Sequence, residues 1–178
     1  MPLIEKRYAE ALINLSVQKK EIDAFEQDFQ SIVDIFNDQE DFRFFLLSPE
    51  ISTEVKKGAL KEVFGGSVKP ELLNFLMLVL DKGRIKFLPG IFEEFISLAD
   101  KEKNVLSMTI ISTSPLSEDQ IKIIKDKYQK IYNASSVKVA LEIDTGILGG
   151  IKIKIGDEVV DGSIKGRLDA LRNVILSK

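Results

Sequence analysis

The segment from Val137 to Arg172 alternates apolar and polar residues and is interrupted by six glycines. The alternating apolar residues form two runs: Val137, Val139, Leu141 and Ile143, and then Ile151, Ile153 and Ile155. A period of two is that of a half-buried strand. Gly156-Asp157 is a two-residue hairpin signal, which makes Val159-Val160 a short return strand. Apolar residues at helical spacing then predict a final amphipathic helix, on Ile164, Leu168, Leu171 and Ile175.

The residues just before this segment predict one more strand and one more helix. Leu106, Met108 and Ile110 alternate with polar residues, as in a strand. Ser117 and Gln120 form a capping box, which opens a helix with Ile121, Ile124, Tyr128 and Ile131 on one face. The predicted order of the second part of the chain is therefore β-α-β-β-β-α, a small sheet with helices packed on it.

Residues 1–104 have the spacing of helices throughout. Apolar residues recur every three or four positions, from Tyr8, Leu12 and Leu15 onward, and most plainly at Ile22, Phe25, Phe29, Ile32 and Phe36. A third helix ends before Pro49, and Ser52 or Thr53 caps a fourth, with Val55, Ala59, Leu60 and Val63 inside. A fifth starts near Pro70, and a sixth starts near Pro89. Short connections predict a compact six-helix bundle.

The composition changes near Asn104, which divides the chain. All eleven phenylalanines lie between Phe25 and Phe95. Residues 1–104 carry a net charge of −5, whereas residues 105–178 carry +2. These changes predict an α+β protein of two domains, a helical bundle over 1–104 and an α/β module over 105–178.

The composition also excludes several classes of function. The chain has no histidine and no cysteine, which removes the commonest general base, the thiol nucleophile and the usual zinc ligands. We therefore expect no catalytic residue, no cofactor and no metal. The longest apolar run, Phe75 to Leu80, is far shorter than the ~20 residues of a membrane span. The net charge of −3 argues against nucleic acid as the main partner.

Three motifs give the chain a family resemblance. The longest joins Gly149-Gly150 and Gly156 to the run Asp161-Gly162-Ser163-Ile164-Lys165-Gly166-Arg167-Leu168. The others are Arg7-Tyr8-Ala9-Glu10-Ala11-Leu12 and Lys82-Gly83-Arg84-Ile85. Together they resemble the delta subunit of bacterial F-type ATP synthase, a relative of the mitochondrial oligomycin-sensitivity-conferring protein. The resemblance covers both predicted domains in the right order.

The resemblance implies a non-catalytic stator subunit of the peripheral stalk. The helical domain would bind the alpha subunits of the catalytic head, and the carboxy-terminal domain would bind the b subunits of the stalk. Rotor torque would then be coupled to ATP synthesis. The subunit would lie at the cytoplasmic face of the bacterial cell membrane, without a span of its own. The alternative is a cytosolic helical adaptor unrelated to ATP synthase; an enzyme using paired carboxylates is a third, weaker hypothesis.

The first and fifth predicted helices are the candidate site for a head-subunit helix. The apolar arc of the first helix spans roughly 200°, wider than the ~100° stripe of a surface helix, and the fifth is apolar on almost every side. By helix geometry and the resemblance, we expect the partner helix to contact Tyr8, Ala11, Leu12, Leu15, Asn74 and Leu78. The competing interpretation is that both helices are simply central in the bundle.

The remaining candidates lie in the second domain. Arg167 and Arg172 lie off the apolar stripe of the final helix and are candidates for contact with an acidic stalk segment. Gly146-Ile147-Leu148-Gly149 matches the G-x-x-G of a nucleic-acid-binding loop, but apolar residues fill it and strands flank it. We therefore interpret Gly149, Gly150, Gly156, Asp161, Gly162 and Gly166 as a structural signature, in which glycine permits backbone bends.

Overall fold

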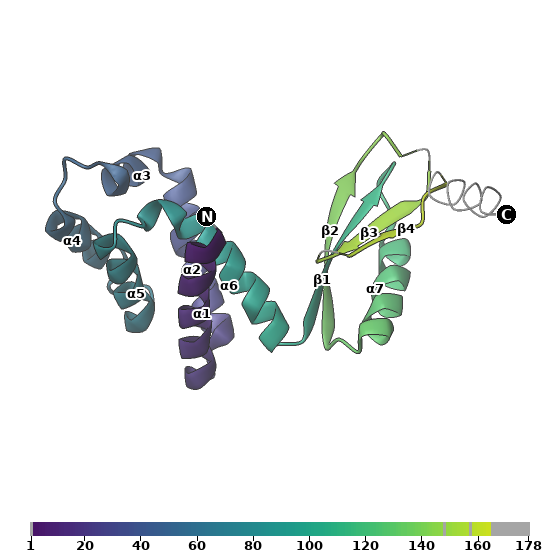
Figure 1. Ribbon diagram of the computed structural model, residues 1–178, viewed down its shortest axis with the longest axis horizontal. Helices are drawn as coiled ribbons and strands as arrows, with labels where there is room; N and C mark the ends of the chain where they lie inside the picture. The colour runs from purple at the N-terminus through teal and green to yellow at the C-terminus, as the bar shows by residue number, and fades with distance from the viewer. Residues whose placement is uncertain (1, 148, 157, 165–178) are drawn as a thin grey trace. The chain divides into compact units, whose positions relative to one another are not determined.

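The computed structural model describes residues 2–147, 149–156 and 158–164 (Figure 1). Contacts along the chain divide it into two compact units, Met1–Ala99 and Asp100–Lys178. The first unit contains helices alone, and the second contains a sheet with a helix against it. The predicted α+β class and the order of its two parts are thus confirmed.

The first unit contains the six predicted helices and one short 3₁₀ turn. They are α1 (Pro2–Lys19), α2 (Ile22–Asp38), α3 (Glu40–Leu47), α4 (Thr53–Phe64), α5 (Pro70–Asp81), η1 (Ile85–Phe87) and α6 (Leu88–Glu102). Local chemistry sets several of the ends. The Ser52 hydroxyl accepts the Val55 N–H at 3.4 Å at the start of α4, and Pro70 starts α5, where no N–H partner is needed.

The core of the first unit is centred on Phe29 of α2, which is fully buried. Its ring lies 6.1 Å from that of Phe75 in α5, and 5.1 and 5.9 Å from those of Phe92 and Phe95 in α6. Tilted and edge-on pairs at these distances are the favoured aromatic geometry. One side chain therefore joins three helices.

The prediction of which residues of α4 face the core is partly wrong. Leu60 is buried as expected, but Val55 and Val63 are exposed, and the structure buries Lys56 and Phe64 in their place. The helix is rotated relative to its apolar spacing because Phe64, whose ring pairs with Phe42 of α3, turns inward. A ring buries more apolar area than a valine, so its position decides which face points inward.

The second unit contains a four-stranded sheet. Its elements are β1 (Val105–Ser112), α7 (Glu118–Tyr132), β2 (Ser136–Ile143), β3 (Ile151–Ile155) and β4 (Glu158–Asp161), and the strand order is β2-β1-β3-β4. The β1–β2 pair is parallel, whereas β1–β3 and β3–β4 are antiparallel. The order β-α-β-β-β is the one predicted; the final helix lies outside the described residues, apart from its start at Ile164.

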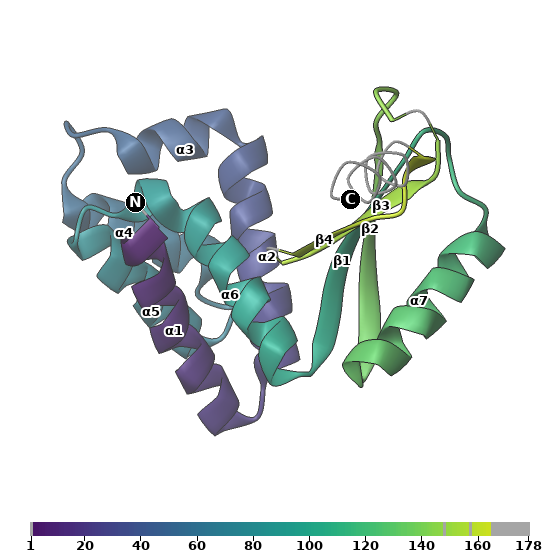
Figure 2. The ribbon, with the colours of Figure 1, turned by 45° about the vertical axis from the view of Figure 1, so that its right-hand side comes forward.

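Helix α7 covers one face of this sheet (Figure 2). It begins with the predicted capping box: the Ser117 hydroxyl accepts the Gln120 N–H, and the Gln120 side chain accepts the Ser117 N–H at 2.9 Å. Tyr128 of α7 packs on the buried strand residues Met108, Ile110, Val137 and Ile153. These alternate positions share one face, as the period-two spacing predicts.

The contact boundary precedes the compositional one because Asp100 belongs to the sheet unit. Its buried carboxylate accepts the Ser107 hydroxyl at 2.7 Å and the Lys138 ammonium at 2.7 Å. Asn104 is fixed too, since its carbonyl accepts the Ser135 N–H at 2.8 Å. Independent folding of the two units, and the boundary after Asn104, stay predictions.

We expect a fragment of residues 100–178 to be more stable than one of residues 105–178. The shorter fragment lacks Asp100, whose buried hydrogen bonds contribute about 1–3 kcal/mol to the free energy of unfolding. Urea unfolding followed by circular dichroism measures the difference. In the longer fragment, Asp100→Ala should reproduce the loss, and Lys101→Ala, at an exposed position, should not. Equal midpoints for both fragments would contradict this assignment.

Candidate functional site

The described residues contain no group of three or more His, Cys, Asp or Glu side chains placed to hold a metal ion. No helix among them is long and apolar enough to cross a membrane. The candidate site is a surface. It is formed by α1 and α5, the helices expected to receive a partner.

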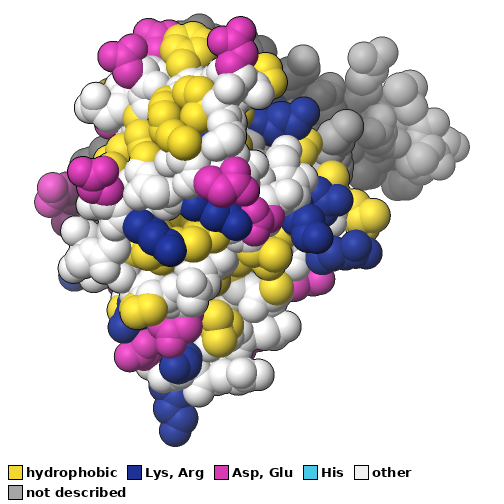
Figure 3. All heavy atoms as spheres, turned by 90° about the vertical axis from the view of Figure 1, so that its left-hand side faces the viewer, with side chains coloured by type: hydrophobic (Ala, Val, Ile, Leu, Met, Phe, Trp, Pro, Cys, Tyr) yellow, Lys and Arg dark blue, Asp and Glu magenta, His cyan; other side chains and the backbone are white. Residues whose placement is uncertain are grey.

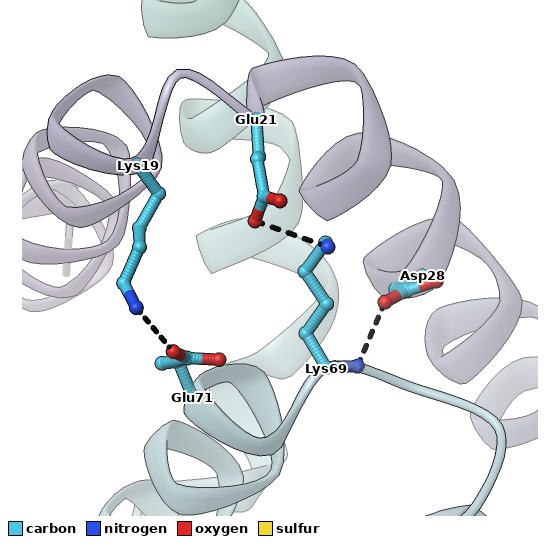
Figure 4. A network of polar contacts seen from close by, with 5 residues as sticks. All are labelled: Lys19, Glu21, Asp28, Lys69 and Glu71. Carbon is cyan, nitrogen blue, oxygen red and sulfur yellow. Dashed lines mark hydrogen bonds and ion pairs between the residues drawn. The ribbon is translucent and has the colours of Figure 1, made fainter.

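A network of charged groups fixes one end of α1 and α2 against the start of α5 (Figure 4). Lys19 at the end of α1 pairs with Glu71 of α5 at 2.7 Å. Lys69 pairs with Glu21 at 3.0 Å through its side chain, and its backbone N–H donates to Asp28 of α2 at 2.9 Å. The network holds the amino-terminal end of α5 against the turn between α1 and α2.

The ion pair between Lys19 and Glu71 shifts the pKa of both side chains. The hydrogen bond that Lys19 donates to Glu71, and then the charge of that carboxylate, raise the pKa of Lys19. The hydrogen bond from Lys19 in turn lowers the pKa of Glu71. The pair therefore stabilises the fold above the ordinary pKa of a carboxylate and below that of an ammonium, and both charges are present at neutral pH.

Tyr8 joins α1 to the middle of α5 and to the segment after it. Its ring lies 6.1 Å from the Phe75 ring, edge-on at 70°. Arg84 donates from Nη1 to the Tyr8 hydroxyl at 3.2 Å, and its guanidinium lies 5.5 Å from the centre of the ring. The structure thus brings together two of the three sequence motifs, which are far apart along the chain.

Five of the six residues expected to face a partner are accessible on α1 and α5. Ala11 and Asn74 are exposed, Leu78 is 48% exposed, and Tyr8 and Leu15 are half-buried. Leu12 is a correction: it is 1% exposed and belongs to the core, so it offers no surface to a partner. Leu12 lies at the centre of the wide apolar arc, next to the other core residues of α1, Ala9 and Ile13, whereas Ala11 lies at its edge.

The glycine signature of the second unit brings two backbone segments into contact. Ile164 donates its N–H to the Gly149 carbonyl at 3.0 Å, and Gly162 donates to Ile151 at 3.0 Å. Gly150 has a φ of +85°, and a Cβ there would meet the Gly162 carbonyl oxygen at 2.6 Å. Glycine is required by both the conformation and the space.

Asp161 closes this contact. Its carboxylate accepts the N–H of the buried Ser163 at 2.8 Å. Hydrogen bonding from Ser163 and, to a smaller degree, the charge of Lys152 lower the pKa of Asp161. The described signature residues thus build a backbone junction. Gly166, Arg167 and Arg172 lie outside the described residues.

Sequence reasoning missed the roles of Arg84, Lys19 and Glu71. The sequence pattern marks Arg84 only as part of a motif, because its contact with Tyr8 forms only when α1 lies beside the segment that follows α5. The Lys19–Glu71 pair has no local signal, because single charges at helix ends are common on any soluble protein.

We expect Gly150→Ala to destabilise the protein more than Gly156→Ala. Both glycines have positive φ, +85° and +56°, so each substitution costs about 1 kcal/mol in backbone strain. A Cβ at Gly150 also lies 2.9 Å from Ser163 Cα, whereas one at Gly156 meets nothing within 4 Å. Overpacking adds about 1–3 kcal/mol at Gly150 alone. Chemical denaturation of the two variants measures the loss in the free energy of unfolding. Equal losses in the two variants would contradict this prediction.

Comparison with known proteins places the chain within one group. The family model described as "ATP synthase delta (OSCP) subunit" matches residues 4–175. The chain is 45% identical to the "ATP synthase subunit delta" of Acetivibrio thermocellus over all of both chains. It is 35% identical to that of Bacillus cytotoxicus, over 98% of this chain and 96% of the relative. A chain of the Toxoplasma gondii mitochondrial ATP synthase hexamer shares the fold, with a TM-score of 0.76, 24% identity and 97% of each chain covered.

Proposed function

The chain belongs to the ATP synthase delta (OSCP) subunit family, and we propose that it links the alpha subunits of the catalytic head to the b subunits of the peripheral stalk. It is a non-catalytic stator subunit of the F-type proton-translocating ATP synthase. It acts at the cytoplasmic face of the bacterial membrane, as part of the complex. Family membership does not support the alternative of an unrelated cytosolic adaptor.

One observation carries the proposed head contact: an exposed small residue, Ala11, stands between half-buried apolar side chains on α1. Tyr8 and Leu15 lie one turn to either side of it, and the exposed Leu78 lies on the neighbouring helix α5. An amphipathic helix docks by placing apolar side chains at intervals of three and four residues against such a surface. A small residue at its centre lets the two helix backbones approach closely.

The groups that surround this surface support a rigid contact. The Lys19–Glu71 pair at one end, and the Tyr8–Phe75 and Tyr8–Arg84 contacts farther along α1, fix α1 against α5 in the free subunit. A preordered surface loses less conformational entropy on binding. A stator needs this, because it must hold the head still while the rotor exerts torque.

We propose that the second unit carries the stalk contact. Its inner strand β1 is hydrogen-bonded to two neighbouring strands, β2 and β3. The residues that follow β4 are hydrogen-bonded to the residues at the start of β3, from Gly162 to Ile151 and from Ile164 to Gly149. Such a module resists deformation because bending it would break several backbone hydrogen bonds together.

Ala11→Asp should weaken binding to the isolated catalytic head by about 2 kcal/mol or more, roughly 30-fold. The substitution places a charge where the partner helix would exclude water, while the exposed position leaves the core intact. Affinity is measured by titration calorimetry, and circular dichroism should stay unchanged.

The matched control is Val17→Asp. Val17 is also an exposed apolar residue of α1, but it lies about 120° from Ala11 around the helix axis. The Val17→Asp variant should bind the head with the same affinity as the unaltered chain. Equal weakening by both substitutions, or loss of helicity in Ala11→Asp, would refute the proposed surface.

Removing residues 105–178 should separate attachment from coupling. The shortened chain keeps every element of the α1/α5 surface, so it should still bind the head, but it loses the proposed stalk unit. Vesicles reconstituted with the shortened subunit should hydrolyse ATP without pumping protons. Normal proton pumping by these vesicles would show that the stalk contact lies elsewhere.

A further inference from the structure

Lys56 of α4 is a buried cation for which the described part of the chain provides no carboxylate. Lys56 is only 8% exposed, and its ammonium donates a hydrogen bond to the Ser48 carbonyl at 2.6 Å. The adjacent Lys57, in contrast, pairs with Asp81 at 2.6 Å. A buried charge needs a compensating charge or several hydrogen bonds, and one neutral carbonyl uses one of three ammonium donors.

The ammonium-bearing side chain lines a cavity of ≈ 310 Å³ in the first unit. Buried apolar side chains from three elements contribute to its wall: Leu46 of α3, Leu80 of α5 and Ile85 of η1. The second charged residue at the cavity is also basic, Lys86 of η1. The cavity therefore combines an apolar wall with two positive charges and contains no acidic residue in its lining.

Exposed apolar side chains extend beyond the mouth of the cavity. Leu47 lines it and is partly exposed, and Phe44, three residues earlier on the same face of α3, is 60% exposed. Apolar side chains gather in the upper part of the face shown in Figure 3. A small carboxylate would neutralise the charge of Lys56 but would leave these side chains in water.

We propose that this cavity, which we term the Lys56 pocket, binds an acidic side chain of a partner protein, presented between apolar residues of one segment. The carboxylate would accept hydrogen bonds from Lys56 and take Lys86 as a second positive neighbour. The flanking apolar residues would cover Leu47 and Phe44. Charge complementarity selects an acidic side chain, and the apolar rim selects a protein segment over a free anion. The pocket is separate from the α1/α5 surface and does not rest on the function proposed for it.

The experiment uses the full-length, ¹⁵N-labelled chain and two capped peptides, acetyl-Leu-Glu-Leu-amide and acetyl-Leu-Gln-Leu-amide. Backbone amide signals of Ser48, Gly83 and Lys86, all residues of the pocket lining, report occupancy. The glutamate peptide should shift these signals saturably and bind at least tenfold more tightly than the glutamine peptide. Similar shifts with both peptides, or none with either, would overturn the proposal.

Two variants and one small anion complete the test. Lys56→Met, which keeps the length of the side chain, should abolish the preference for the glutamate peptide, and Lys57→Met should retain it. Sodium acetate at the same concentration and ionic strength should leave the signals in place. Acetate binding as tight as that of the glutamate peptide would overturn the choice of a protein segment. Because the assay uses neither head nor stalk, its result is independent of the Ala11→Asp result.

Discussion

The position of the candidate docking surface depends on one ring, that of Phe29. It contacts phenylalanines of α5 and α6, and Phe75 of α5 in turn contacts Tyr8 of α1. A continuous chain of rings thus runs from the centre of the core to the surface of α1. Edge-on ring pairs are directional, so this chain fixes rotation as well as distance between helices. The charged network at Lys19 and Lys69 then fixes the ends.

Most of the fold was predictable because periodicity is a local property of the sequence. The six helices, the capping box at Ser117 and the β3–β4 hairpin each follow from residues close together in the chain. The rotation of a helix about its axis was less accessible. Leu12 and Ala11 lie on the same wide apolar arc, and only the packing of neighbouring helices decides that Leu12 is buried and Ala11 exposed.

The two least predictable features involve charged residues in unusual surroundings. Nothing local distinguishes Lys56 from Lys57, yet one is buried and the other forms a surface ion pair. Asp100 likewise lies in a helix whose spacing predicts a continuous bundle element, but its carboxylate belongs to the sheet. Both are set by partners at other points of the chain, which single-sequence patterns do not encode.

The order of the strands in the sheet gives the chain two folding timescales. Every core residue of the helical unit, from Ala9 to Ala99, leaves the ribosome before β1 does. β1 is an inner strand, and its partners β2 and β3 follow only after the α7 crossover and the loop to Ile151. At about 5–20 residues per second, an open edge of β1 waits a few seconds for β3. In that interval the nascent chain carries all the helices of the first unit together with an unpaired edge of an apolar strand, and such an edge favours aggregation.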